Sequence, residues 1–147
     1  MKGRNPENTG RKTEERGMLE AGIRGRLEKT VTEEMTARAM GSGELEVLAT
    51  PALIALVEET AWKSAAEYLE PGWGTVGTKI NIDHISATPV GMKIWCETEI
   101  VQVDRRRAVF HAAAYDERGK IGEGTHERFA VQNESFMNRA MAKLNRE

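Results

Sequence analysis

The longest apolar run in the chain predicts one buried helix. Residues 52–57 (ALIALV) are apolar on every side of a helical turn, which is typical of a helix covered on most of its surface. The Thr50-Pro51 pair before this run suits a helix start, with threonine as the N-cap and proline at the first helical position. Because Pro71-Gly72 marks the end, we predict a helix from about residue 51 to residue 69.

Alternating apolar and polar positions predict five strands beside this helix. One strand precedes it, at about residues 27–37, and a Gly41-Ser42-Gly43 break separates the two. The breaks between the later strands are short, which is typical of hairpins and therefore of antiparallel pairing. These later strands are predicted at residues 75–88, 92–104, 107–116 and 120–132, and residues 133–147 as a short polar helix or a frayed tail.

A helix that is apolar on several sides needs a sheet that wraps around it. One layer of strands leaves part of such a helix uncovered, so we expect a second copy of the chain to close the rest. The prediction is an α+β fold, with a long central helix and a five-stranded antiparallel sheet in one domain at residues 18–139, assembled as a homodimer. Residues 1–17 are expected to be a disordered or loosely packed extension, and residues 140–147 a C-terminal tail.

Composition and charge narrow the function. The 21 basic and 23 acidic residues give a net charge of −2, which argues against a binder of nucleic acid or of anionic membranes. Three histidines and one cysteine are too few for a Cys/His zinc site, and we predict neither a metal nor another cofactor. The single cysteine excludes an internal disulfide framework, and no apolar run suits a membrane span or a signal peptide. We therefore expect a cytoplasmic protein.

Glu58 is the first candidate for chemistry, because its neighbours on the helix face are apolar. The adjacent Glu59 differs, since Lys63 is within reach as an ordinary surface partner. A carboxylate held out of water is costly unless it is paired or used. Glu58 is therefore either a general base or a structural carboxylate bonded to the backbone or to a partner chain. Its apolar neighbours three and four residues away are Ile54, Ala55, Ala61 and Trp62.

Thr50 also has two interpretations. It is either a simple N-cap or a residue whose helix start binds an oxyanion through free amides. Since Pro51 has no N–H, the donors would be the amides of Ala52, Leu53 and Ile54.

His84 shares one side of the predicted strand 75–88 with Ile80 and Ile82, and we expect this side to face the helix. It is either a core histidine or a catalytic one. Alternation places Gly77 on the opposite side, where it allows close approach of a ligand or marks a bulge. The run GTHER, which ends at Arg128, places charges inside a strand, as a polar network near a site or as an edge strand, and Arg128 is a candidate substrate contact.

The spacing of Thr50 and Glu58 constrains any shared site. They lie eight residues apart on one helix, about 12 Å along its axis, so they cannot both touch one carbonyl from the same helix. Two helices that run antiparallel across a two-fold axis would set the start of one against the middle of the other. We therefore predict a composite site at a homodimer interface, with two sites per dimer.

Three blocks of the sequence resemble a known family. GSGELEVLATPALIALVEETA, LEPGWGTVGTKINIDHISATPVGM and IGEGTHERFAV are similar to the hot-dog-fold thioesterases related to fluoroacetyl-CoA thioesterase. The resemblance implies a helix wrapped by a five-stranded sheet, a dimer, and a catalytic set at Thr50, Glu58 and His84 with a contribution from Gly77. In the fluoroacetyl-specific enzyme, phenylalanines before the helix form a lid. Residues 39–45 of this chain contain none, which leaves the acyl group open.

The sequence therefore predicts an acyl-CoA thioesterase that acts on a small or medium acyl-CoA. Glu58 would activate water or attack the thioester directly, and Thr50 would hold the carbonyl or the water or act as a transient nucleophile. His84 would orient the carboxylate or carry the proton to the departing thiol. Two alternatives stay open: a non-catalytic module that binds acyl-CoA or an acyl carrier, and an enoyl-CoA hydratase or dehydratase.

Overall fold

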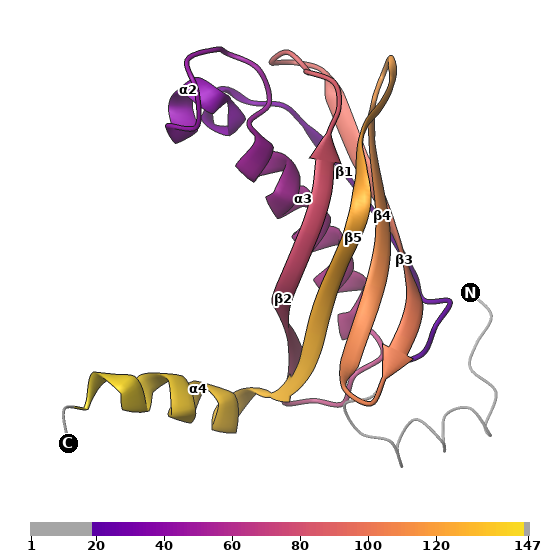
Figure 1. The fold of residues 1–147 in the computed structure, drawn as a ribbon, viewed down its shortest axis with the longest axis vertical. Coiled ribbons are helices and arrows are strands. Elements are labelled where there is room, and N and C mark those ends of the chain that lie inside the picture. Colours follow the sequence, from indigo (N-terminus) through magenta and orange to yellow (C-terminus); the bar gives the residue numbers. More distant parts are fainter. Residues whose placement is uncertain (1–18, 146–147) are drawn as a thin grey trace.

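One sheet and one long helix make up most of the structure, a computed structural model that describes residues 19–145. The sheet is antiparallel in the order β1-β3-β4-β5-β2, and α3 lies against one of its faces (Figure 1). This confirms the predicted α+β architecture. The extension predicted at residues 1–17 lies outside the described residues. The strands are β1 (Arg24–Thr30), β2 (Trp73–His84), β3 (Lys93–Asp104), β4 (Arg107–Asp116) and β5 (Gly119–Gln132), and the helices are η1 (Glu33–Met35), α2 (Ala37–Met40), α3 (Thr50–Ala66), α4 (Asn133–Met141) and η2 (Ala142–Leu144).

The alternating burial of side chains along β3 shows which face of the sheet packs against α3. Ile94, Cys96 and Ile100 are fully buried, whereas Glu97 between them is exposed. Successive side chains of a strand point to opposite faces, so one face of the sheet is apolar and covered by α3 while the other is polar.

α3 is covered on one side only. Leu53, Leu56 and Val57 are buried in a core cluster that they share with residues of the sheet. On another side of the helix, Ala55 is exposed and Trp62 is 44% exposed. One sheet thus reaches only part of the circumference of the helix, as predicted for a single layer of strands, and closure by a second copy stays a prediction.

Several predicted boundaries shift. The strand predicted at 27–37 ends at Thr30, and α2 follows because the Thr36 hydroxyl caps it by accepting a hydrogen bond from the amide of Ala39 at 3.1 Å. β2 ends at His84 rather than at residue 88, and the buried Thr88 hydroxyl instead donates to Asp116 at 2.7 Å. The predicted helix at 51–69 ends at Ala66, and the C-terminal segment forms a helix rather than a frayed tail.

A register shift in β2 changes the side that Gly77 faces. Gly77 pairs with Arg128 and Lys79 pairs with Glu127, so Thr78 is one extra residue in β2. A one-residue bulge exchanges the two sides of a strand, and Gly77 consequently faces α3 on the side that also carries His84. The prediction that Gly77 lies on the opposite side from His84 is therefore wrong.

Gly25 in β1 tests how closely α3 packs on the sheet. A Cβ at this position would lie 2.7 Å from the Cβ of Ser64 and 3.0 Å from the carbonyl oxygen of Thr60, both on α3. We expect Gly25→Ala to lower the free energy of unfolding by about 1–3 kcal/mol, the usual cost of overpacking, as measured by urea unfolding. The control Glu28→Ala, at an exposed position of the same strand, should change it by less than about 0.5 kcal/mol. Equal stability of Gly25→Ala and wild type would contradict this close approach.

Candidate active site

The start of α3 and the end of β2 bring Thr50 and His84 together. The Thr50 hydroxyl oxygen lies 2.8 Å from Nδ1 of His84. Thr50 is the first helical residue, Ala49 occupies the N-cap position, and no side chain caps this helix. The N-cap interpretation of Thr50 is therefore wrong, because its hydroxyl is bonded to the imidazole instead.

The second ring nitrogen of His84 is available for a ligand. His84 Nε2 is buried and has no hydrogen-bond partner within residues 19–145. Desolvation lowers the pKa of His84, although a hydrogen bond to the backbone of Ser86 opposes this shift. A neutral imidazole with one nitrogen on a hydroxyl and the other unused is suited to proton transfer. The surrounding hollow is lined by the segments 47–50 and 84–87 and by Ala37 and Ser42.

The helix start narrows the choice of amide donors. The amide of Leu53 donates to the carbonyl of Ala49 at 3.0 Å, and the Leu53 side chain is fully buried in the core. Leu53 is thus committed to the fold. Ala52 lies one residue nearer the helix start, in the turn where amides lack an intrahelical acceptor. Of the three amides predicted as donors, that of Ala52 therefore fits the geometry better than that of Leu53.

Glu58 lies in a second group, two turns further along α3. Its Oε2 is 3.7 Å from Nη1 of Arg128, and its side chain is 45% exposed. The expected burial of Glu58 among apolar neighbours is therefore wrong in the single chain, because it lies on the uncovered side of α3 with Ala55 and Trp62. The expected surface pair of Glu59 is confirmed, with Lys63 at 2.8 Å and Lys29 at 2.9 Å.

Gly77 makes room for this second group. A Cβ at Gly77 would lie 2.8 Å from Glu58 Oε2 and 3.2 Å from both Arg128 Nη1 and His126 Cε1. A side chain here would displace the carboxylate or the guanidinium. The bulge and the glycine together allow the backbone of β2 to approach the carboxylate directly.

Arg128 and His126 on β5 form a buried hydrogen-bond network. Arg128 donates through Nε to the Thr75 hydroxyl at 2.8 Å and through Nη2 to the Thr75 carbonyl at 3.1 Å. Its Nη1 lies 3.0 Å from His126 Nε2. A guanidinium only donates, so His126 Nε2 accepts, and Nδ1 carries the proton that is donated to the Lys79 carbonyl at 2.8 Å. The network thus fixes one neutral tautomer of His126.

Burial and the nearby positive charge of Arg128 disfavour protonation of the His126 ring. Desolvation is the largest influence that lowers the pKa of His126, and the positive charge of Arg128 lowers it further. Desolvation also lowers the pKa of Arg128, while Glu58 raises it, and the guanidinium stays charged. His126 and Thr75 did not emerge from the sequence. The signal was the GTHER run, in which residues 126 and 128 share one side of a strand.

The two groups remain separate within one chain. Thr50 and His84 lie at the start of α3, and Glu58, Gly77 and Arg128 lie about 12 Å further along the helix axis. Each group has only part of the predicted catalytic set. The two groups are separated by about two turns of α3.

The described part of the chain shows neither a metal site nor a reactive cysteine. Between residues 19 and 145, no three His, Cys, Asp or Glu side chains are placed to hold a metal ion. Burial raises the pKa of the Cys96 thiol to about 11, so this fully buried thiol is not a nucleophile at neutral pH. Over the same residues, no helix has both the length and the apolar character that crossing a membrane requires.

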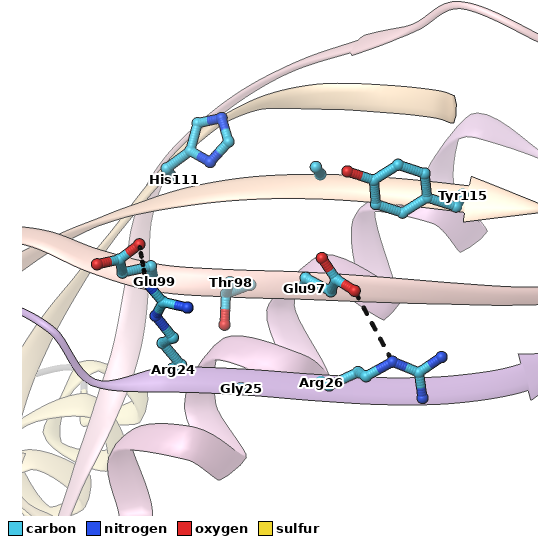
Figure 2. A pocket seen from close by; sticks show the side chains of 9 residues that line it. Arg24, Gly25, Arg26, Glu97, Thr98, Glu99, His111 and Tyr115 are labelled. Carbon is cyan, nitrogen blue, oxygen red and sulfur yellow. Dashed lines mark ion pairs between the residues drawn. The ribbon is translucent and has the colours of Figure 1, made fainter. Parts of the chain in front are cut away.

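A hollow on the outer face of the sheet is not part of either group (Figure 2). Arg24 pairs with Glu99 at 3.7 Å and Arg26 with Glu97 at 3.9 Å across its floor. These side chains alternate with the buried residues of β3 and so point away from α3. Exposed pairs of this kind contribute little, and the hollow holds no nucleophile beside a base.

Comparisons with known proteins find the same family from sequence and from structure. The family model described as fluoroacetyl-CoA-specific thioesterase matches residues 31–134. A fluoroacetyl-CoA thioesterase of Streptantibioticus cattleyicolor is 40% identical over 91 residues, which are 62% of this chain and 66% of that protein.

Solved structures agree with this match. A structure of the fluoroacetyl-CoA thioesterase FlK has a TM-score of 0.80 and 33% identity, over 86% of this chain and 98% of that one. A thioesterase superfamily member from Thermus thermophilus has a TM-score of 0.78 and 25% identity, over 88% and 98% of the two chains. A hot-dog-like protein from Thermanaerovibrio acidaminovorans, at 19% identity and a TM-score of 0.80 over 88% and 96%, shares the fold. The hot-dog fold is thus confirmed.

The neutral state of His126 gives a pH dependence of stability. Unfolding frees His126 to take up a proton near its ordinary pKa of about 6.5, while the folded network resists protonation. The unfolded state therefore binds more protons, and the free energy of unfolding should fall as the pH decreases from about 7 to about 5. His84, whose pKa is also lowered, contributes in the same direction. In His126→Gln, which keeps an acceptor for Arg128 but does not titrate, urea unfolding should show a shallower fall. An unchanged slope would contradict a neutral His126.

Proposed function

Because this chain belongs to the fluoroacetyl-CoA-specific thioesterase family, we propose that it is an acyl-CoA thioesterase that hydrolyses a small or medium acyl-CoA to the free acid and CoA. The observation that carries this proposal is the Thr50–His84 hydrogen bond at the start of α3, with the other imidazole nitrogen buried and unpartnered. A hydroxyl, an imidazole and helix amides at one point are groups that act on a carbonyl.

The complete site is composed from two copies of the chain. β2 is an edge strand, and the uncovered side of α3 with Glu58 and Trp62 lies beside it. Antiparallel pairing of β2 with its copy, centred between Gly77 and His84, would set His84 of one protomer against Gly77 of the other. The start of one α3 would then face the middle of the other, which brings Thr50 and His84 of one protomer to Glu58 of its partner. Such pairing also removes the exposed edge and covers Trp62.

The two groups then have distinct roles. The thioester carbonyl oxygen would accept hydrogen bonds at the start of α3, from the amide of Ala52 and the groups around Thr50. Glu58 of the partner would take a proton from water or attack the carbonyl itself, while Arg128 stabilises the carboxylate charge from 3.7 Å. His84 would deliver a proton to the departing CoA thiol through its free Nε2.

The tautomer of His84 separates the two chemical routes. If Nδ1 accepts the Thr50 proton, the hydroxyl is activated as a nucleophile and an acyl-threonine intermediate forms. If Nδ1 donates to Thr50, the hydroxyl positions the water, and Nε2 is a base rather than an acid at the start of the reaction. Both routes use the same 2.8 Å contact.

The alternative functions find less support. An enoyl-CoA hydratase or dehydratase would need an aspartate that acts with the histidine, but Asp83 is exposed and lies on the other side of β2 from His84. A non-catalytic acyl-CoA or acyl-carrier module would bind without releasing thiol. The relatives named above are called thioesterases, which favours hydrolysis. A cytoplasmic location stays a prediction.

Glu58→Gln tests the carboxylate without changing its size. Release of CoA thiol from a panel of acyl-CoA chain lengths should fall by about 10²–10⁴-fold, because the amide cannot act as a base or a nucleophile. Glu59→Gln is the matched control, since the adjacent carboxylate pairs with Lys29 and Lys63 on the surface and should keep activity within about twofold. Equal rates for Glu58→Gln and wild type would remove Glu58 from the reaction. Binding without release at every chain length would favour the non-catalytic module.

Mixing two inactive variants tests the composite site. Thr50→Ala and Glu58→Gln are each expected to be inactive as homodimers. When both chains are expressed together, a mixed dimer has one site with both defects and one intact site. About half of the dimers are mixed, so activity should recover to about one quarter of the wild-type rate. Absence of recovery in a mixture shown by mass spectrometry to contain mixed dimers would mean that each site is built within one chain.

A further inference from the structure

α4 carries an apolar stripe that its own domain does not cover. Met137, Met141 and Leu144, the last in η2, are each more than half exposed. Phe136 and Ala140 lie beside them, and the five side chains span an arc of roughly 140° at 3.6 residues per turn. A continuous stripe of this width is typical of a helix packed against an apolar surface.

Among the described residues, the hydrogen bonds that attach α4 to the sheet lie near its first turn. The amide of Asn133 donates to the carbonyl of Gly72 at 2.8 Å, and the Gln132 side chain caps the helix through the amide of Ser135 at 2.8 Å. Beyond this turn the helix projects past the edge strand β2 and away from the body of the domain (Figure 1). A helix of nine residues is marginal in water without packing, so the stripe needs a partner surface.

The other end of β2 exposes a second set of apolar side chains. Leu45 and Ile85 are more than half exposed, and Met40 and Val90 are also exposed. Ile85 lines the hollow that contains Thr50 and His84. Within one chain this end and α4 lie far apart, with α2 at one end of β2 and α4 at the other (Figure 1).

The two-fold arrangement of the proposed function brings these surfaces together. α4 starts beside Gly74, where the Asn133 side chain would lie 2.8 Å from a Cβ on that glycine. When β2 pairs antiparallel with its copy so that His84 faces the other Gly77, Gly74 lies opposite the segment that follows Ile85 in the partner. The free part of α4 projects past β2 (Figure 1). A partner paired with β2 would lie on this same side.

We propose that α4 docks its apolar stripe on a second copy of the chain, against the segment around Ile85 and Leu45, and closes the partner's acyl-CoA site. The inference rests on the dimeric site of the proposed function and adds an arm to it. Residues 39–45 offer no bulky aromatic side chain above Thr50, whereas α4 of the partner would supply Phe136 and two methionines. Flexible methionines suit a surface that adapts to an acyl chain. The partner copy would thus contribute to the wall of each site.

Disulfide trapping tests the docking directly. Cysteine is introduced at Met137 or Met141 and paired in the same chain with cysteine at Ile85 or Leu45. The native Cys96 is fully buried and stays in place. Oxidation should give a covalent dimer on non-reducing gels for at least one pair. The control pair Met137→Cys with Val101→Cys, in which Val101 is exposed on β3 away from β2, should stay uncrosslinked.

Loss of the stripe tests its role at the site. Met137→Glu combined with Met141→Glu should raise the KM for acyl-CoA by about tenfold or more, because charge replaces apolar contact. The matched control Asn138→Glu with Arg139→Glu, on the polar side of α4, should stay within about twofold. Light scattering of each variant reports the oligomeric state.

The outcomes separate this inference from the proposed function. A light-scattering dimer that releases thiol but gives no crosslink at any pair, or an unchanged KM in the methionine variant, would overturn the docking of α4 and leave the thioesterase proposal intact. A monomeric wild-type protein would overturn the docking as well. An absence of thiol release from wild type, with crosslinks formed, would overturn the proposed function alone.

Discussion

A helix that its own sheet covers on only one side is the constraint on which this site depends. Five strands reach around part of α3 and bury Leu53, Leu56 and Val57, which fixes the helix against the sheet. The uncovered side carries Glu58 near Trp62, which is 44% exposed, and burial of the Glu58 charge would be costly without a partner such as Arg128. In the proposed dimer, the copy that covers this side of α3 would also complete the site.

The polar network beside Glu58 holds the Arg128 side chain in place through several hydrogen bonds. Arg128 is held at three points by Thr75 and His126, and it is nearly fully buried while its charge faces a half-exposed carboxylate. A buried guanidinium is tolerated when its donors are satisfied, and a satisfied network has one geometry. Glu58 consequently meets a positive charge whose position is set by β5 and β2 rather than by the mobile end of a long side chain.

The sequence predicted much of this arrangement, for identifiable reasons. The run 52–57 and the turn residues between strands are local signals, so the helix, the strands and their antiparallel pairing followed from the residues alone. Glu58 and His84 were singled out because each is polar within an apolar pattern, and Thr50 because it lies at the start of the predicted helix. Contacts between distant segments were not accessible in this way. The hydrogen bonds of Arg128 to Thr75, the contact of the Thr50 hydroxyl with His84, and the side of β2 that Gly77 faces depend on how distant segments pair, and one extra residue in β2 changes that pairing.

The bulge at Thr78 sets the positions of Gly77 and His84 relative to each other along β2. Six residues (78–83) lie between Gly77 and His84, and because one of them is the bulge residue, this even number keeps both on the same side of β2. A relative that lost the bulge would need a compensating change of one residue elsewhere in the strand to keep both groups on the helix side. The number of residues in this part of β2 therefore decides which side of the strand each group faces, whatever the side chains between them.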